Sequence, residues 1–196
     1  MEYSISDLEA RNEIIEKKVK EFNLDVYEQE FEIISFNEML GYEAYVGMPT
    51  RYPHWSFGKA YEKNKLLYSY NLTGLPYEMV INSNPCLAYL MKDNTLLLQI
   101  LTMAHVYGHN DFFKNNRLFK TFTNAKLTVE KFKNHADRIR SYIHDPSIGY
   151  EAVEQILDAA HSIRYQCQGF RKTPLVEGEK VEYPYTNLLE FLGRFG

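Results

Sequence analysis

Residues 95–110 constrain the fold more than any other part of this sequence, because the segment contains no Asp, Glu, Lys or Arg. Its apolar residues occur on every side of a helical wheel, and a helix that is apolar all round is typical of the centre of a structure. Its most hydrophobic part, residues 96–103, is too short to span a bilayer. The segment therefore predicts a central buried helix, about residues 95–110, surrounded by other helices.

Helical spacing of apolar residues and the positions of turn residues divide the rest of the chain into helices and short strands. The first predicted helix covers residues 6–22, with Ser6 and Glu9 as a capping box. Further predicted helices cover residues 37–46, 57–67, 128–142, 150–165 and 187–195, and predicted strands cover residues 30–35 and 77–82. The expected fold class is mainly α with a small β component (α+β), with one or two short strands.

Length and charge limit the kinds of protein that this chain can be. Its 196 residues suit one domain, so residues 1–196 are expected to form a single domain. The net charge of −4 argues against nucleic-acid binding, which needs cationic surface to neutralise phosphates. No glycine-rich phosphate loop or nucleophile elbow is present, so no nucleotide cofactor is expected.

The cysteines and the N-terminus bear on location. Cys86 and Cys167 are the only cysteines, and they are expected to be reduced thiols. Cys86 is also the candidate for a nucleophile, should a Cys–His pair exist. The first residues lack the basic and then apolar layout of a signal peptide. The sequence therefore predicts a cytoplasmic protein with no transmembrane segment.

His105 and His109 are the most informative polar residues of the predicted central helix. Residues four apart lie on one side of a helix, and two imidazoles at this spacing can bind one metal ion, as in metalloprotease helices. In those proteases a Glu follows the first His, whereas here Val106 does. A protease of that type would lack its general base. The alternative is that both histidines are core residues bonded to tyrosine hydroxyls or to the backbone, and the sequence leaves both interpretations open.

A second set of candidate ligands lies on the predicted helix at residues 150–165. Glu154, Asp158 and His161 share one side of that helix, and a carboxylate three residues before a His is the pattern of carboxylate-bridged metal sites in bundles. Their alternative role is to form the solvated face of an amphipathic helix. His54, which lies between Pro53 and Trp55, is either a packed loop residue or a pocket residue.

Combining the two helices gives a hypothetical metal site. Its nitrogen donors would be His105, His109 and His161, and its oxygen donors would come from Glu154, Asp158 or Glu78. Nitrogen and carboxylate ligands suit zinc or iron. In this hypothesis Glu78 or Glu154 is the catalytic acid or base.

Three stretches of the sequence resemble proteins of the SpoVR family (stage V sporulation protein R-like). The first contains Tyr-Pro-His-Trp-Ser-Phe-Gly-Lys at residues 52–59, after Val-Gly-Met-Pro at 46–49. The second contains Tyr-Glu-Met-Val-Ile-Asn-Ser-Asn-Pro at 77–85, followed by Ala-Tyr-Leu-Met at 88–91. The third contains Ala-His at 104–105, Tyr-Gly-His-Asn at 107–110 and Phe-Phe-Lys-Asn-Asn at 112–116. The resemblance spans most of the chain, from Leu8 to about Leu192.

This resemblance implies a bacterial cytoplasmic protein, linked in spore formers to building the spore cortex, a modified peptidoglycan layer. Relatives also occur in bacteria that make no spores. The family supplies no settled reaction and no accepted catalytic residues, so the metal site stands on the residues alone. Such proteins are usually more than twice as long as this chain, which is therefore expected to be a fragment of a longer protein or a short relative.

Two functional hypotheses follow. The first is a metal-dependent enzyme, a hydrolase or transferase that acts on a cell-wall precursor or peptide. The second is a non-catalytic assembly module that recruits an unidentified protein partner during cortex formation, with structural histidines. The sequence does not choose between them.

Overall fold

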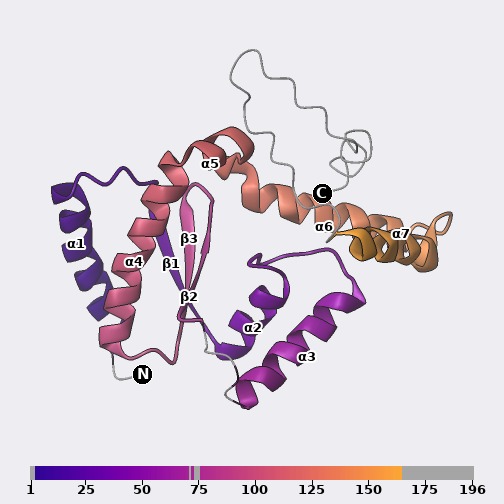
Figure 1. The fold of residues 1–196 in the computed structure, drawn as a ribbon, viewed down its shortest axis with the longest axis horizontal. Helices are drawn as coiled ribbons and strands as arrows, with labels where there is room; N and C mark the ends of the chain where they lie inside the picture. Colours follow the sequence, from indigo (N-terminus) through magenta and orange to yellow (C-terminus); the bar gives the residue numbers. More distant parts are fainter. Residues whose placement is uncertain (1–2, 71, 73–75, 165–196) are drawn as a thin grey trace.

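The computed structural model describes residues 3–70, 72 and 76–164, and it consists mainly of helices around a small sheet (Figure 1). The mainly α class with a small β component is as predicted, and the helix predicted at residues 187–195 lies outside the described residues. In chain order the elements are α1 Ile5–Glu21, β1 Gln29–Ile34, α2 Phe36–Ala44, α3 Trp55–Ser69, β2 Glu78–Ile81, β3 Cys86–Met91, α4 Leu96–Asn115, α5 Arg117–Phe122, the 3-10 turn η1 Ala125–Leu127, α6 Thr128–His144 and α7 Gly149–Ile163.

The described sheet has three strands, in the order β1-β3-β2. β3 pairs in parallel with β1 and antiparallel with β2. The sequence predicted β1 and β2 but not β3. A central strand that is covered on both faces is apolar throughout, so β3 lacks the alternation that identifies a half-buried strand.

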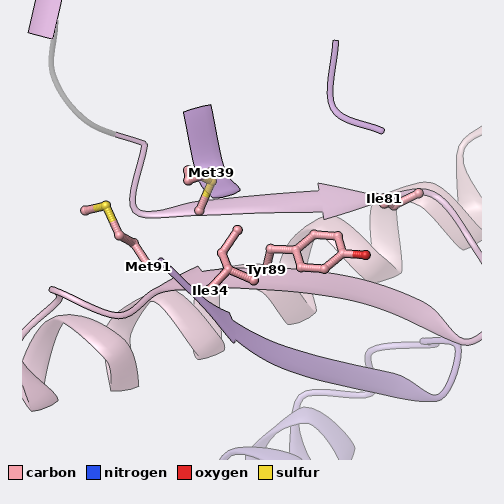
Figure 2. Packing of buried hydrophobic residues seen from close by; sticks show 5 residues of the cluster. All are labelled: Ile34, Met39, Ile81, Tyr89 and Met91. Carbon is pink, nitrogen blue, oxygen red and sulfur yellow. The ribbon is translucent and has the colours of Figure 1, made fainter. Parts of the chain in front are cut away.

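One face of the sheet packs on α2. Ile34, Ile81, Tyr89 and Met91 from the three strands meet Met39 of α2 in a buried cluster (Figure 2). The opposite face packs on α1 and α4, where Leu90 of β3 lies in a cluster with side chains of both helices. Alternate residues of each strand therefore belong to different layers, and the parity of a residue determines which helices it meets.

Two buried amides attach α4 to the sheet. Gln99 donates from Nε2 to the Met91 carbonyl oxygen at 3.0 Å and to the Tyr3 hydroxyl at 2.8 Å. One turn from the other end of the helix, Asn110 donates to the Tyr27 carbonyl oxygen at 3.0 Å and accepts from its N–H at 2.8 Å. Both amides are fully buried and satisfied, so they fix the rotation of α4 about its own axis.

The expectation that α4 is buried on all sides was wrong for the described residues. Gln99, Met103, Val106 and Asn110 share the face toward the sheet and α1, but on the opposite face Leu97, Leu101 and Phe112 expose 69%, 59% and 53% of their surface. Apolar composition alone does not specify what covers a helix face. None of the described helices is long and apolar enough to cross a membrane.

α6 and α7 form a hairpin whose two helices pack side by side (Figure 1). Arg140 of α6 donates to the Arg51 carbonyl oxygen at 3.0 Å, and the Arg51 guanidinium lies 4.6 Å from the centre of the Phe132 ring. The hairpin is thereby joined to the loop before α3. This placement decides where the α7 candidates of the sequence analysis lie.

The capping box of α1 lies two residues earlier than predicted. Ser4 accepts from the Asp7 N–H, and the Asp7 carboxylate accepts from the Ser4 N–H at 2.8 Å. Ser6 and Glu9 follow the same spacing, so the pattern fits both registers. The buried Tyr3, whose hydroxyl donates to the Asn94 carbonyl oxygen at 3.1 Å, fixes the start of the helix.

Candidate metal centre

Glu78 is placed by the parity of β2. It pairs in register with Leu90, which faces α1 and α4, whereas the next pair, Met79 and Tyr89, faces α2. The Glu78 carboxylate therefore points to the α4 side of the sheet. β2 is an edge strand, and the Glu78 side chain keeps 19% of its surface exposed, so this carboxylate remains accessible to solvent.

His105 and His109 lie one turn apart on the side of α4 that borders β2. Their rings meet edge to face with centroids 4.4 Å apart. The His105 side chain is 62% exposed, whereas His109 is half-buried. Within residues 3–164 as described, neither imidazole has a hydrogen-bond partner, so their ring nitrogens are free to bind a ligand.

The three side chains form the one group of potential metal donors found among the described residues. One donor atom from each of Glu78, His105 and His109 lies within 4.8 Å of the other two. The distance from His105 Nε2 to Glu78 Oε1 is 3.7 Å. Two ligands of a tetrahedral zinc ion, each about 2.0–2.1 Å from the metal, stand roughly 3.4 Å apart. Small side-chain rotations would therefore bring these donors to bonding distance.

The charge environment of His109 favours the form that binds metal. Burial lowers the pKa of the His109 ring, and the charge of the adjacent His105 lowers it further, against the opposing effect of Glu78. A metal ligand must be the neutral imidazole, and a lowered pKa keeps that form populated near neutral pH.

The α7 candidates lie elsewhere, so the structure does not bring them together with the α4 histidines in the single site that the sequence predicted. His161 and Asp158 face the loop before α3 and the first turn of that helix. The Glu154 carboxylate accepts a hydrogen bond from the Tyr150 hydroxyl at 2.6 Å within α7 itself. Of the predicted ligands and catalytic residues, the structure brings together Glu78, His105 and His109 only.

His161 belongs to a hydrogen-bonded cluster with His54, whose ring stacks on it at a centroid distance of 4.0 Å. The Ser56 N–H donates to His54 Nδ1 at 3.3 Å, so that nitrogen is unprotonated and His54 Nε2 donates to Asp158 at 3.1 Å. The Ser56 hydroxyl lies 2.7 Å from the same His54 nitrogen and so donates to it.

The remaining hydrogen bonds of this cluster follow from that direction. The Ser56 hydroxyl oxygen, 3.2 Å from His161 Nδ1, accepts from it. His161 Nε2 is then the acceptor for the Tyr52 hydroxyl at 2.8 Å. All four ring nitrogens of the two histidines make hydrogen bonds to protein groups. These bonds join α7 to the first turn of α3 and the loop before it, and no ring nitrogen remains free to bind a metal. The sequence left His54 as either a packed or a pocket residue, and the structure has both features, since its buried ring is hydrogen-bonded and also lines a small cavity with Trp55.

Cys86 is not suited to act as a nucleophile. Its side chain is fully buried, its thiol donates to the Ile81 carbonyl oxygen at 3.5 Å, and burial raises the pKa of the thiol to about 11. The thiolate is the reactive species, so this cysteine is inert near neutral pH. Cys167 lies outside the described residues.

Sequence reasoning missed one ring that contacts the metal donors and one polar residue further along the strand direction. The Phe113 ring stacks on His109 with centroids 6.0 Å apart and an interplanar angle of 25°. Asn82 follows β2 and has the same parity as Glu78. The signals were present, since Phe113 continues the four-residue spacing of His105 and His109. The sequence did not show that the residues of α4 at this spacing lie beside β2 and the residue that follows it.

Comparisons with known proteins place the chain in a family. Residues 2–187 match the model of the SpoVR-like protein family. An uncharacterized protein, YcgB of Escherichia coli (strain K12), is 44% identical over 152 residues. That match covers 76% of this chain but only 29% of the relative, so the chain spans less than a third of the relative's length. No solved structure matches the chain.

Proposed function

The chain belongs to the SpoVR-like protein family, and on this basis we propose that it contributes a metal centre to an enzyme of that family, with Glu78, His105 and His109 as ligands of zinc or iron. The observation that carries the proposal is the convergence of one carboxylate and two imidazoles within 4.8 Å, where neither imidazole makes a hydrogen bond to the described residues. Polar groups that are partly buried normally have hydrogen-bond partners, and the half-buried His109 has none among the described residues, whereas the exposed His105 lies beside the Glu78 carboxylate.

The donor set suits catalysis better than structural support. Two imidazoles and one carboxylate are the protein ligands of hydrolytic zinc sites and of non-haem iron sites, and both kinds keep coordination positions open. Structural zinc sites are closed by four protein ligands and are rich in cysteine. The exposed His105 leaves the solvent side of this cluster free for water or a substrate.

A metal bound here would polarise a substrate carbonyl or phosphoryl oxygen, or lower the pKa of a water molecule. Glu78 holds the metal or serves as the proton acceptor beside it. His105 and His109 orient the metal through α4, whose rotation is fixed by the two buried amides. Glu154 lies outside this centre and takes no part in it.

The proposed substrate is related to the cell wall, and the proposed biological role is in spore cortex formation. Support comes from the link of the SpoVR family to the cortex. The geometry of the centre specifies the chemistry that is available but not this biological role.

Metal analysis tests the proposal directly. The chain, purified from metal-replete medium, is expected to contain one zinc or iron ion, measured by elemental mass spectrometry. The double variant His105→Ala/His109→Ala is expected to lose the metal while circular dichroism shows that it remains folded. The matched control is His144→Ala, an exposed histidine of α6, which should keep its metal. Metal-free wild-type protein, after reconstitution has been attempted, would reject the proposal.

A non-catalytic assembly module is the second candidate, because of the exposed apolar face of α4. Contiguous exposed apolar surface often marks protein interaction sites. An experiment in cells distinguishes these two candidate functions. If the folded double variant His105→Ala/His109→Ala retains full biological function, the assembly role is favoured over the metal-dependent one.

A further inference from the structure

One cavity among the described residues lies next to the proposed metal centre. Its volume is about 690 Å³, within the range of small-molecule sites. Phe113, whose ring stacks on His109, forms part of its wall. Asn82, which follows the strand that carries Glu78, forms another part. The cavity therefore begins where the row of metal donors ends.

The geometry of a regular helix and strand gives the approximate distance between the metal donors and the cavity wall. Phe113 lies four residues beyond His109 on α4, which is about 6 Å along a helix. Asn82 lies four residues beyond Glu78 along the strand direction, which is about 13 Å. Along these two elements the metal donors therefore lie roughly 6–13 Å from the nearest residues of the cavity wall.

The charge of the cavity wall favours an anion. Three lysines line it, Lys114, Lys120 and Lys126, against one acid, Asp25. Lys114 is already paired with Asp25 and also donates to the Val26 carbonyl oxygen at 2.9 Å. Lys120 lies 3.5 Å from the Asn115 side-chain oxygen, with no carboxylate beside it among the described residues. Lys126 is exposed, and no described side chain pairs with it. Two ammonium groups are therefore free to bind a phosphoryl or carboxylate group.

The rest of the wall is rich in uncharged polar groups and rings. Asn84, Asn124 and Thr123 line it together with Phe119. At its edge Asn82 has a buried side-chain oxygen that accepts no hydrogen bond from the described residues. An unsatisfied buried acceptor is destabilising, and a ligand hydroxyl or N–H that bonds to it after a rotation of the Asn82 side chain relieves that cost. Amides, hydroxyls and flat rings together suit a ligand with several hydroxyl groups on a ring.

We propose that this cavity binds a phosphorylated sugar, free or within a nucleoside diphosphate sugar, with the phosphoryl group on Lys120 and Lys126 and the sugar ring toward Phe113 and the metal. An acidic peptide fits less well, because Lys120 and Lys126 both line this one cavity and so present their charges to a single compact ligand. The proposal rests on the proposed metal centre for the reaction, but binding in the cavity does not require a metal.

Calorimetry with the metal-free and zinc-loaded chain tests this inference. The probes are glucose 1-phosphate, N-acetylglucosamine 1-phosphate and UDP-N-acetylglucosamine, with glucose and inorganic phosphate as their separate parts. At least one sugar phosphate is expected to bind with a dissociation constant below about 1 mM, and more tightly than either part alone. The comparison between the monophosphates and the nucleotide sugar distinguishes the two sources.

Variants tie the binding to the cavity. Lys120→Gln/Lys126→Gln is expected to weaken sugar phosphate binding about tenfold, because two charge-assisted contacts are lost. Lys17→Gln/Lys20→Gln, two exposed lysines of α1, should leave it unchanged. No binding by any of the three sugar phosphates, equal binding by the cavity variant, or tighter binding of an acidic tripeptide overturns the proposal. If the metal centre alone is wrong, metal analysis fails while the sugar phosphate still binds. If the cavity alone is wrong, the chain holds metal and binds no sugar phosphate.

Discussion

The two histidine pairs of this chain contrast in what their ring nitrogens contact. His54 and His161 stack face to face, and all four nitrogens bond to Asp158, Ser56 and Tyr52. His105 and His109 meet edge to face, with a carboxylate oxygen at 3.7 Å, beyond hydrogen-bond distance, as the nearest charged partner. The first pair joins two helices. The second has free nitrogens.

Hydrogen bonding determines which of these histidines are available for chemistry. A ring nitrogen that already bonds to protein must break that bond before it can bind a metal, and such a bond contributes about 0.5–1.5 kcal/mol. The α4 pair, His105 and His109, has no such hydrogen bond to break among the described residues before it binds a metal. Spacing in the sequence made both helices look suitable, whereas hydrogen bonding separates them. If this separation is correct, substitutions in the two pairs have different effects on zinc binding and on stability.

Zinc should stabilise the wild-type chain strongly. At a free zinc concentration about 100 times the dissociation constant, binding to the native state adds about 2.7 kcal/mol to the free energy of unfolding. Thermal unfolding in the presence and absence of zinc measures this, with magnesium as the control ion. His105→Ala/His109→Ala should show no such increase, whereas His161→Ala should retain it. If the His161 variant loses the zinc effect, the two clusters are not independent.

Removing His161 should destabilise the chain even without metal. His161→Ala leaves the Tyr52 hydroxyl without its acceptor and removes one of the two hydrogen bonds of the Ser56 hydroxyl, which keeps its bond to His54. An unsatisfied buried or half-buried group costs about 1–3 kcal/mol. His105→Ala removes a largely exposed ring with no hydrogen bond among the described residues, so its effect should be within about 0.5 kcal/mol. Urea unfolding of both metal-free variants makes the comparison. Equal effects would show that the α4 pair is structural as well.

The two carboxylates should behave in opposite ways. Asp158→Asn weakens an acceptor that holds both His54 and the Trp55 indole, so it should lower the stability of the metal-free chain without changing zinc affinity. Glu78→Gln should lower zinc affinity and leave the stability of the metal-free chain nearly unchanged. Zinc titration and urea unfolding of the two variants measure both quantities. A loss of zinc affinity in Asp158→Asn would contradict the assignment of ligands.

Local patterns in the sequence predicted much of the fold. Capping residues and apolar spacing placed β1, α2, α4 and α6 within a few residues of their observed bounds, since these signals act over one or two turns. The sequence did not predict β3, because its residues are buried on both faces and show no alternation. It predicted too much burial for α4, because apolar composition does not show what covers a helix face. In each case the missing information concerns a neighbouring element.

The candidate site shows the same division. The i, i+4 spacing of His105 and His109 is a property of one helix, so the sequence predicted that they share a side. That Glu78 lies opposite them depends on the pairing of β2 with β3, and that His161 does not depends on where the α6–α7 hairpin packs. Both are tertiary relations. The sequence could name Glu78 as one of several possible oxygen donors, but only the strand register selects it.

The stacked pair His54 and His161 should make the free energy of unfolding depend weakly on pH. Burial lowers the pKa of His161, and the charges of His54, Arg164 and Arg51 lower it further, against the opposing effect of Asp158. Its pKa in the folded chain therefore lies below the unfolded value of about 6.5, and between the two values the unfolded chain binds more protons. The free energy of unfolding therefore rises with pH across that window. The contribution of His161 to stability is lost as the pH falls from about 6.5 toward the folded pKa. Urea unfolding from about pH 5 to pH 7.5 should show this loss in wild-type chain, less of it in His161→Gln, and the full loss in the exposed control His144→Gln. An identical slope in His161→Gln would mean that the stacked pair does not sense protons, and the contrast between the two pairs would then rest on metal binding alone.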